Sequence, residues 1–429
     1  MKNLALLIMI FLLVGCSLGK EKNLELFLRE LPGSIIEKIE NGDSLRETYK
    51  VLIRQRIDHF GDDTTTFLQK IYLSHLDFSK PVVIVTEGYQ TEQPYMSEPA
   101  KIIDANQIIV EHRYFGESVP ENLNWKFLNI RQAAEDHHII VQLFKEIYQT
   151  KWISTGVSKG GQTTLYYKYY YPEDVDASVA YVAPINFDKS EPRVFRFLAQ
   201  VGSDSCREKI FEFQKLLLRN KQKLMPLFEQ YAKENKLTFK MGYDAAFEYC
   251  VLEFSFAFWQ WGDLPCDSIP KDAKDINLVF KAFEKVGFSF FAEEEIEKIR
   301  PFFYQALTEI GFYSYDVKPF GELIKTVKEP NFYFTFPDGV DTTYDYKSMR
   351  EVNNFLQNEG NNIIYVYGEF DPWSASAVQL IPGKTNALKM LKKGGNHKTR
   401  MISFDVNEKE LIYSSLEEWL GIEIDRIIK

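Results

Sequence analysis

A serine flanked by glycines is the first feature of this chain that could do chemistry. Residues Gly156–Gly160 read GVSKG, which follows the pattern G-x-S-x-G. An apolar run precedes this segment and a tyrosine-rich helical run follows it, so the serine falls on a strand-to-helix turn. In such a turn the glycines avoid backbone clashes, and the hydroxyl of Ser158 is lifted above the sheet edge. The pattern predicts that Ser158 is a nucleophile; the alternative is an ordinary glycine-serine turn that opens a helix.

A histidine and an acid are available to activate this serine. A serine hydroxyl is a poor nucleophile unless a base takes its proton, and that base needs an acid to orient it. The chain order for a G-x-S-x-G nucleophile is serine, acid, histidine. Only His397 of the six histidines follows Ser158, and it lies in a glycine-rich loop after a predicted strand. Asp371 stands just beyond the preceding strand and before a proline, so it is the predicted acid, with Glu369 and Asp341 as rivals.

Backbone N–H groups must also stabilise the negative oxygen that forms when a serine attacks a carbonyl group. The first expected donor is the N–H of Lys159, directly after the nucleophile. The second is expected from the turn after the apolar strand around Val82–Val85. The N–H of Tyr89 is the predicted donor there, with Gly88 allowing the chain to approach closely.

The order of the predicted elements places these residues in an α/β fold. An edge hairpin is expected at 48–60 and 66–76, with 32–46 as a lead-in. Continuous apolar runs, typical of strands buried on both faces, are expected at 81–89, 107–116, 151–157, 177–187, 362–371 and 386–391. Helices are expected between them, so the sequence predicts an α/β-hydrolase fold with a mainly parallel sheet and helices on both faces. In such sheets the chemistry gathers at the carboxyl ends of the strands.

The pattern changes to amphipathic helices between residues 188 and 346. Helices are expected there at 208–234, 243–260, 273–285 and 293–311. We interpret 188–346 as a helical cap inserted between two parts of the hydrolase core, residues 31–187 and 347–429. The cap sequence is rich in aromatic residues; most are expected to pack in its core, and some to line a pocket over Ser158.

The first 15 residues resemble a lipoprotein signal peptide. Lys2 precedes an apolar run that is too short to span a bilayer. The following LVGC resembles a bacterial lipobox, in which Cys16 becomes a lipidated N-terminus, and residues 16–30 would then form a tether. The alternative is an ordinary signal peptide that happens to contain a cysteine. We expect an exported, membrane-anchored lipoprotein of a bacterial cell envelope.

Composition narrows the range of partners. The net charge is −10, from 51 basic and 61 acidic side chains. This charge argues against a nucleic-acid surface and suits a cationic ligand, such as a free amino terminus. No cluster has metal-ligand spacing and no phosphate loop is complete, so no cofactor is expected. Cys206, Cys250 and Cys266 allow at most one internal disulfide, and the sequence does not choose the pair.

Several motifs together resemble one family. They are QRIDHF at 55–60, EHRYFGES at 111–118, GVSKGG at 156–161, FDPW at 370–373 and GNH at 395–397, with two further segments of the cap at 261–266 and 308–313. This set resembles the proline-oriented exopeptidases of the α/β-hydrolase clan. The nearest group is the bacterial prolyl tri/tetrapeptidyl aminopeptidases, sister to lysosomal prolylcarboxypeptidase and dipeptidyl peptidase II. The resemblance covers nearly all of the mature chain.

The resemblance implies a role for each matching residue. Ser158 would be the nucleophile, Asp371 the orienting acid and His397 the base, beneath a helical cap that restricts access to peptide ends. The implied reaction releases short peptides, such as tripeptides, from a free N-terminus, with proline or a small residue at the cleavage point. Lys159 departs from the pattern, since relatives often have an aromatic or small residue there.

An aminopeptidase must also bind an ammonium group, for which a partly buried carboxylate discriminates strongly. The candidates are Glu87, Glu248, Glu253 and Glu309, with Glu87 and Glu309 as first choices. Two rival functions remain from the sequence. One is an exported esterase or lipase with the same three residues, and the other is a lipid-anchored binding protein on an inert hydrolase fold.

Overall fold

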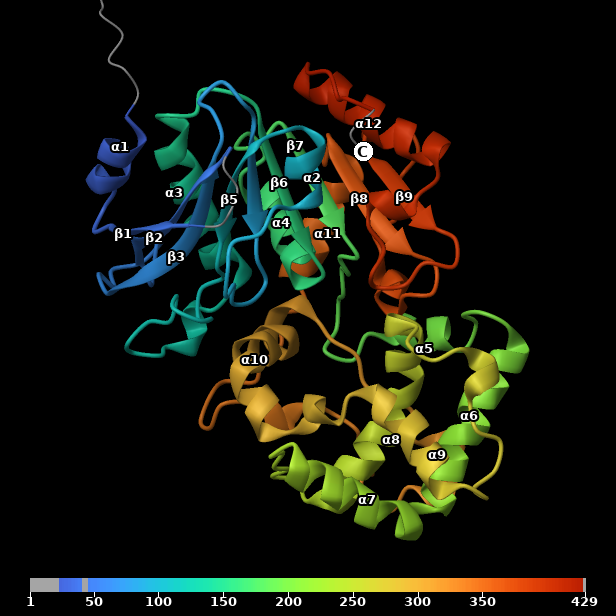
Figure 1. The fold of residues 1–429 in the computed structure, drawn as a ribbon. Coiled ribbons are helices and arrows are strands. Elements are labelled where there is room, and N and C mark those ends of the chain that lie inside the picture. The colour runs from blue at the N-terminus through green and yellow to red at the C-terminus, as the bar shows by residue number, and fades with distance from the viewer. Residues whose placement is uncertain (1–22, 41–44, 427–429) are drawn as a thin grey trace, which may run out of the picture.

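The computed structural model describes residues 23–40 and 45–426, so the expected signal peptide and Cys16 lie outside the described residues. Within these ranges the chain forms a nine-stranded sheet in the order β1-β2-β3-β5-β4-β6-β7-β8-β9 (Figure 1). Its strands are β1 (Ile35–Ile39), β2 (Glu47–Arg56), β3 (Thr66–His75), β4 (Val82–Thr86), β5 (Asn106–Val110), β6 (Trp152–Val157), β7 (Ala177–Tyr181), β8 (Ile363–Gly368) and β9 (Leu388–Lys392).

The sheet is parallel over its larger part and antiparallel at one edge. β4 runs parallel to both β5 and β6, and β7, β8 and β9 continue in the same direction. At the other edge β1, β2, β3 and β5 form antiparallel pairs. The expected hairpin is confirmed as β2 and β3. The lead-in expected at 32–46 was wrong where β1 forms, because the side chains of this edge strand are exposed or half-buried and show no buried alternation.

Alternate residues of the central strands pack into two hydrophobic cores. Val82 and Ile84 of β4 belong to a core shared with α3 (Ile130–Lys145), α4 (Lys159–Tyr170) and α11 (Ser348–Asn358). Val83 and Val85 belong to a core shared with α2 (Glu98–Ile102) and α12 (Val406–Leu420). This alternation explains the continuous apolar runs, because both faces of each strand are buried. These five helices cover the two faces of the sheet. The architecture is that of an α/β-hydrolase.

Part of the expected tether is folded. Leu24–Glu30 form helix α1, which is capped by Asn23. Leu24 and Leu28 are buried in the larger core, because leucines four residues apart lie on one face of a helix. The tether expected for 16–30 is therefore wrong for the residues of α1.

Between β7 and α11 the chain forms helices and short turns, and none of its residues, all of them described, lies in a strand. Figure 1 shows the helices from α6 (Asp204–Arg219) to α10 (Glu293–Gln305) gathered on one side of the sheet, away from α12. One helix expected at 208–234 is broken into two at Asn220, whose side chain bonds to the carbonyl of the preceding turn. The helix α5 was not expected. The helices are α5 (Pro192–Leu198), α6 (Asp204–Arg219), α7 (Lys221–Glu234), α8 (Tyr243–Trp261), α9 (Ile276–Phe283) and α10 (Glu293–Gln305).

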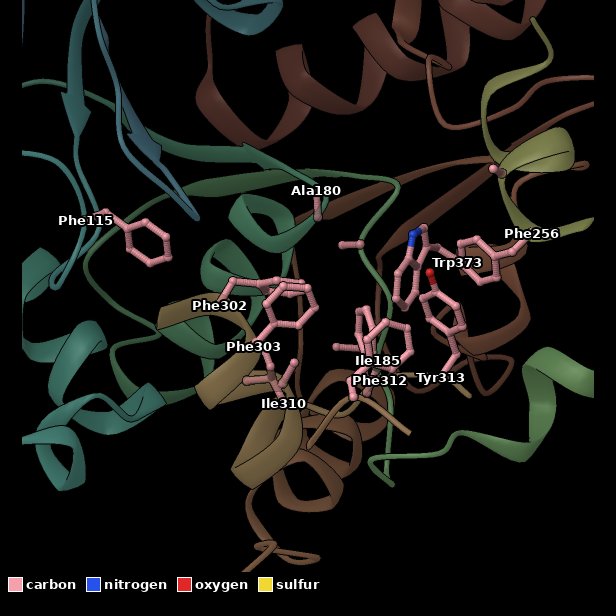
Figure 2. Packing of buried hydrophobic residues seen from close by; sticks show 14 of the residues in the cluster. Phe115, Ala180, Ile185, Phe256, Phe302, Phe303, Ile310, Phe312, Tyr313 and Trp373 are labelled. Carbon is pink, nitrogen blue, oxygen red and sulfur yellow. The ribbon is translucent and has the colours of Figure 1, made fainter. Parts of the chain in front are cut away.

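An aromatic cluster joins this helical cap to the sheet. Phe256 of α8 stacks on Tyr313 with ring centroids 3.9 Å apart, and both rings meet the edge of Trp373 just after β8 (Figure 2). Phe302 and Phe312 extend the same cluster, with their ring centroids 5.4 Å apart. These rings are buried in one continuous core with residues of the sheet, so the cap packs directly over the carboxyl ends of the strands.

A disulfide links two cap segments. Cys206 at the start of α6 bonds to Cys266 just after α8, and Cys250 within α8 is buried and free. This settles the pairing that the sequence left open. Within the described ranges, no helix is long and apolar enough to cross a membrane, and no cluster of three or more His, Cys, Asp or Glu side chains is placed to hold a metal ion.

Candidate active site

Ser158 lies in the turn between β6 and α4, at the carboxyl end of a parallel strand. Its φ is +57°, a strained backbone conformation for a residue that carries a Cβ. A Cβ on Gly156 would come within 2.2 Å of the Gly160 carbonyl oxygen, and a Cβ on Gly160 within 2.8 Å of the Thr86 carbonyl oxygen. The turn therefore requires both glycines. Ser158 is the N-cap residue of α4, but its hydroxyl makes no capping hydrogen bond.

Asp371 follows β8 and His397 follows β9, the neighbouring parallel strand. Nδ1 of His397 lies 2.7 Å from Oδ2 of Asp371, whose side chain is fully buried. The other carboxylate oxygen accepts the N–H of Trp373 at 3.1 Å. The rival acids bond elsewhere: Glu369 accepts an N–H from the loop before His397, and Asp341 caps an exposed turn.

A cavity of about 730 Å³ contains both Ser158 and His397. It lies between the strand ends and the cap, since residues from both parts line it. No hydrogen bond joins the Ser158 hydroxyl to His397 among the described residues; catalytic hydrogen bonds are often long before substrate binds. The apolar part of the wall includes Tyr89, Val157, Trp261, Val286, Phe290, Ile299, Phe302, Phe312, Tyr313 and Trp373.

The end of helix α8 holds the loop that carries His397. The backbone N–H of His397 donates to the carbonyl of Gln260 at 3.0 Å, and the Asn396 side chain donates to the carbonyl of Trp261 at 2.8 Å. The Trp261 ring meets the imidazole edge-on at 5.4 Å. The cap therefore helps to position this histidine.

Two backbone N–H groups beside the serine have no hydrogen-bond partner among the described residues. They belong to Lys159, the first residue of α4, and to Tyr89 in the turn after β4. Gly88 lies against the start of α4, since a Cβ there would be 2.7 Å from the backbone nitrogen of Gly160. Both free donors thus come from segments that meet next to Ser158, as expected for an oxyanion site.

Glu253 is the one of the four predicted amine-binding acids, all of them described, that lines the cavity. The hydroxyl groups of Tyr313 and Tyr315 donate to its Oε2 at 2.9 Å and 2.7 Å. Its Oε1 has no hydrogen-bond partner among the described residues. Burial raises the pKa of Glu253 to about 8.

The other three acids are engaged away from the cavity wall. Glu87 accepts the hydroxyl of Tyr95 at 2.5 Å, and burial raises its pKa. Glu309 accepts the N–H of Ile130 at the start of α3 at 2.8 Å, and burial raises its pKa to about 8. Glu248 accepts three backbone N–H groups of a cap loop. Of the four candidate acids, the structure therefore places Glu253 at the cavity wall and the first choices, Glu87 and Glu309, away from it.

Three charged residues that line the cavity were not predicted from the sequence. Glu295 of α10 lines the cavity and pairs with Lys298 at 3.3 Å. It belongs to a run of three acids at the start of a helix, a common surface pattern, so nothing in the sequence marks it. Lys398 and Arg400 lie on the His397 loop, and their proximity to His397 in the sequence was the available signal.

Sheet topology and the strained serine turn define the class of protein as an α/β-hydrolase. Comparison with known proteins places it more closely. The chain matches the PS-10 peptidase S37 family over residues 25–428. It is 31% identical over 387 residues to the prolyl tri/tetrapeptidyl aminopeptidase of Streptomyces mobaraensis, across 87% of this chain and 81% of that protein. This chain therefore belongs to the PS-10 peptidase S37 family and is a serine peptidase.

More distant similarities are shorter or weaker. The human lysosomal Pro-X carboxypeptidase is 28% identical over 167 residues, which is 33% of each chain. The proline iminopeptidase structure from Mycobacterium smegmatis has 12% identity and a TM-score of 0.41, and the match covers 90% of this chain and 98% of that one. Family membership therefore favours a serine peptidase over the esterase, the lipase and the inert binding protein that the sequence left open.

Proposed function

We propose that this protein is an exported aminopeptidase that releases short peptides, such as tripeptides, from free N-termini, preferably after proline. The observation that carries the proposal is a single cavity that contains Ser158, His397 and the buried carboxylate of Glu253. The Streptomyces mobaraensis relative, a prolyl tri/tetrapeptidyl aminopeptidase, supports release from the N-terminus.

In the proposed mechanism, His397 takes the proton of the Ser158 hydroxyl through Nε2. Asp371 accepts a hydrogen bond from Nδ1–H of His397 and stabilises the imidazolium that forms. The Ser158 oxygen bonds to the carbonyl carbon, and the N–H groups of Lys159 and Tyr89 stabilise the oxyanion. The C–N bond then breaks, and His397 gives its proton to the leaving amine. Water, deprotonated by His397, hydrolyses the acyl-enzyme and frees Ser158.

Glu253 is the proposed anchor for the ammonium group of the substrate. Because both tyrosine hydroxyls bind Oε2, the carboxylate is held in one orientation and Oε1 remains for a ligand. An anchor at a fixed distance from Ser158 would set how many residues fit between the N-terminus and the cut, so it would select short fragments. Glu295 is a second cavity acid, but it is half-buried and already paired with Lys298.

Aromatic rings near the nucleophile support the proline preference. Tyr89 and Phe302 both line the cavity, with ring centroids 5.5 Å apart. Proline offers a compact apolar ring and no backbone N–H, so an aromatic wall can bind it without leaving a donor unpaired.

Export and a lipid anchor at Cys16 remain part of the proposal. The signal-like sequence before Cys16 supports them. The disulfide between Cys206 and Cys266 adds support, because such bonds persist in oxidising compartments outside the cytosol. In a bacterial host, wild type is expected in the membrane fraction and Cys16→Ser in the soluble fraction. Equal partition of the two would contradict a lipid anchor.

The activity is tested with chromogenic peptides that end in proline and have either a free or an acetylated N-terminus. Wild type is expected to cleave the free form much faster, and Ser158→Ala to cleave neither. Cleavage of the acetylated form at an equal rate would contradict amine recognition. Cleavage of simple acyl esters alone would contradict the peptidase assignment.

A further inference from the structure

The side chain of Lys159 is buried beside the nucleophile, although lysine is among the residues most rarely buried. Its exposed fraction is 2%, and Nζ donates a hydrogen bond to the carbonyl oxygen of Gly88 at 2.7 Å. No carboxylate of the described residues lies within ion-pair distance of it. Burial lowers its pKa well below the usual value, and the negative charge of Glu309 opposes this shift. The burial of this amino group against a single carbonyl group therefore needs an explanation in the structure around it.

Two aromatic rings enclose the amino group. Nζ lies 5.1 Å from the ring centroid of Phe115 and 5.7 Å from that of Tyr89. The aliphatic part of Lys159 abuts Gly88, since a Cβ on Gly88 would lie 2.7 Å from the Lys159 Cβ. The hydrogen bond to Gly88 is therefore held in a close-packed, water-poor setting, where such bonds are strong.

The held carbonyl group belongs to the same peptide unit as the N–H of Tyr89. A trans peptide is planar, so its C=O and N–H point in opposite directions. When Lys159 holds the carbonyl of Gly88 on the buried side, the N–H of Tyr89 must point the other way. That N–H has no partner among the described residues, and Tyr89 lines the cavity with Ser158.

Glycine makes this peptide easy to turn. Gly88 has no Cβ, and rotation of the unit between it and Tyr89 would exchange the two polar groups. The carbonyl would then face the cavity in place of the N–H and repel a developing oxyanion. The hydrogen bond from Lys159 to the carbonyl of Gly88 opposes that rotation, because the rotation would leave the buried amino group of Lys159 without a partner.

We propose that the side chain of Lys159 is a positioning residue that fixes the Gly88–Tyr89 peptide with its N–H facing the oxyanion site. The main chain of Lys159 would supply one oxyanion donor, and its side chain would orient the other. This inference rests on the proposed role of Ser158 as the nucleophile.

The test compares Lys159→Met with Lys168→Met. Methionine keeps most of the volume but removes the donor. Lys168 is a matched control, because it lies on the same helix, has an exposed fraction of 7% and donates to the carbonyls of Pro172 and Val175, yet does not line the cavity. Acylation by p-nitrophenyl acetate, peptide hydrolysis, and the affinities of a peptide boronate and of a product peptide are measured for each variant.

Loss of one oxyanion donor predicts a kcat roughly 100- to 1,000-fold lower in Lys159→Met, with KM almost unchanged. The boronate, which forms a tetrahedral adduct, should lose affinity in parallel, while the product peptide should not. Lys168→Met should keep kcat and the boronate affinity, whatever it does to the unfolding temperature. Equal kcat in Lys159→Met and wild type, or equal loss of boronate and product binding, would overturn the proposal.

Two further results separate this inference from the proposed function. If wild type acylates with p-nitrophenyl acetate but cleaves no peptide, the aminopeptidase proposal fails, while the acylation rates still test the role of Lys159. If Ser158→Ala acylates like wild type, the nucleophile is wrong and both fail. Should Lys159→Met not fold, Lys159→Gln is measured by the same criteria, because its shorter side chain cannot keep the bond to Gly88.

Discussion

Replacement of Glu253 by glutamine should remove the preference for a free N-terminus and leave the reaction itself intact. The amide oxygen of glutamine can still accept the hydroxyl groups of Tyr313 and Tyr315 that now bind Oε2. The substitution therefore removes the negative charge with little change in shape. We expect a lower kcat/KM for peptides with a free N-terminus and an almost unchanged value for acetylated peptides.

The size of the effect follows from the burial of Glu253. Its pKa is raised to about 8, so at pH 7 about one carboxyl group in ten is ionised, and ionising it costs about 1.4 kcal/mol. Removal of one partner from a buried charge pair costs about 3–5 kcal/mol. The net loss at pH 7 is then about 1.5–3.5 kcal/mol, or roughly 10- to 400-fold in kcat/KM.

The same pKa gives the direction of the pH dependence. Glu253 must be ionised to bind an ammonium group, so binding strengthens as the pH rises toward about 8. The α-amino group of a peptide has a pKa of about 7.7–8.0 and must stay protonated, so binding weakens again above that range. Discrimination between free and acetylated peptides should therefore peak near pH 8. Its decline on the acid side should disappear in Glu253→Gln.

The assay is the ratio of kcat/KM for free and acetylated forms of one peptide, measured between pH 6 and pH 9. Glu87→Gln is the control, because Glu87 is also a partly buried acid near the strand ends but does not line the cavity. The reasoning is refuted if Glu253→Gln keeps the wild-type ratio, or if Glu87→Gln lowers it by as much.

The remaining predictions concern the base, its loop and the cap. Asp371→Asn should lower kcat by roughly 10⁴-fold with little change in KM, because His397 loses the acid that holds its tautomer. An unchanged kcat with a raised KM would contradict this role. Asn396→Ala removes a hydrogen bond to the end of α8 worth about 1 kcal/mol, so kcat should fall roughly fivefold in steady-state assays with KM unchanged. The double substitution of Cys206 and Cys266 by serine should lower the free energy of unfolding in urea by about 2–4 kcal/mol, since the bond spans 60 residues, and no change would show that the cap does not depend on it.

The parts of the site that depend on local backbone geometry could be predicted from the sequence. The turn at Ser158 requires Gly156 and Gly160 because their neighbours leave no room for a Cβ. Both glycines and the serine lie within five consecutive residues, so the sequence shows this requirement directly. His397 could be found because it is the only histidine after the serine. Asp371 and His397 then meet because they follow adjacent parallel strands.

The acids of the cavity could not be chosen from the sequence, because burial there depends on how cap helices pack. Glu253 lies in α8, which is apolar on most sides, so no face of the helix identifies the cavity side. The sequence suggested Glu309 as the anchor, yet its carboxylate accepts the first N–H of α3, from a distant part of the chain. The edge strand β1 was missed for the opposite reason, since its exposed side chains leave no alternation to detect.

The central claim is tested most directly by identifying the first products from an unlabelled peptide that has proline at its third residue and both termini free. Mass spectrometry of the early digest by wild type should show the N-terminal tripeptide and the matching remainder, and Ser158→Ala should show neither. Release of single residues from the C-terminus, or the same N-terminal fragment from the Ser158→Ala variant, would contradict the account.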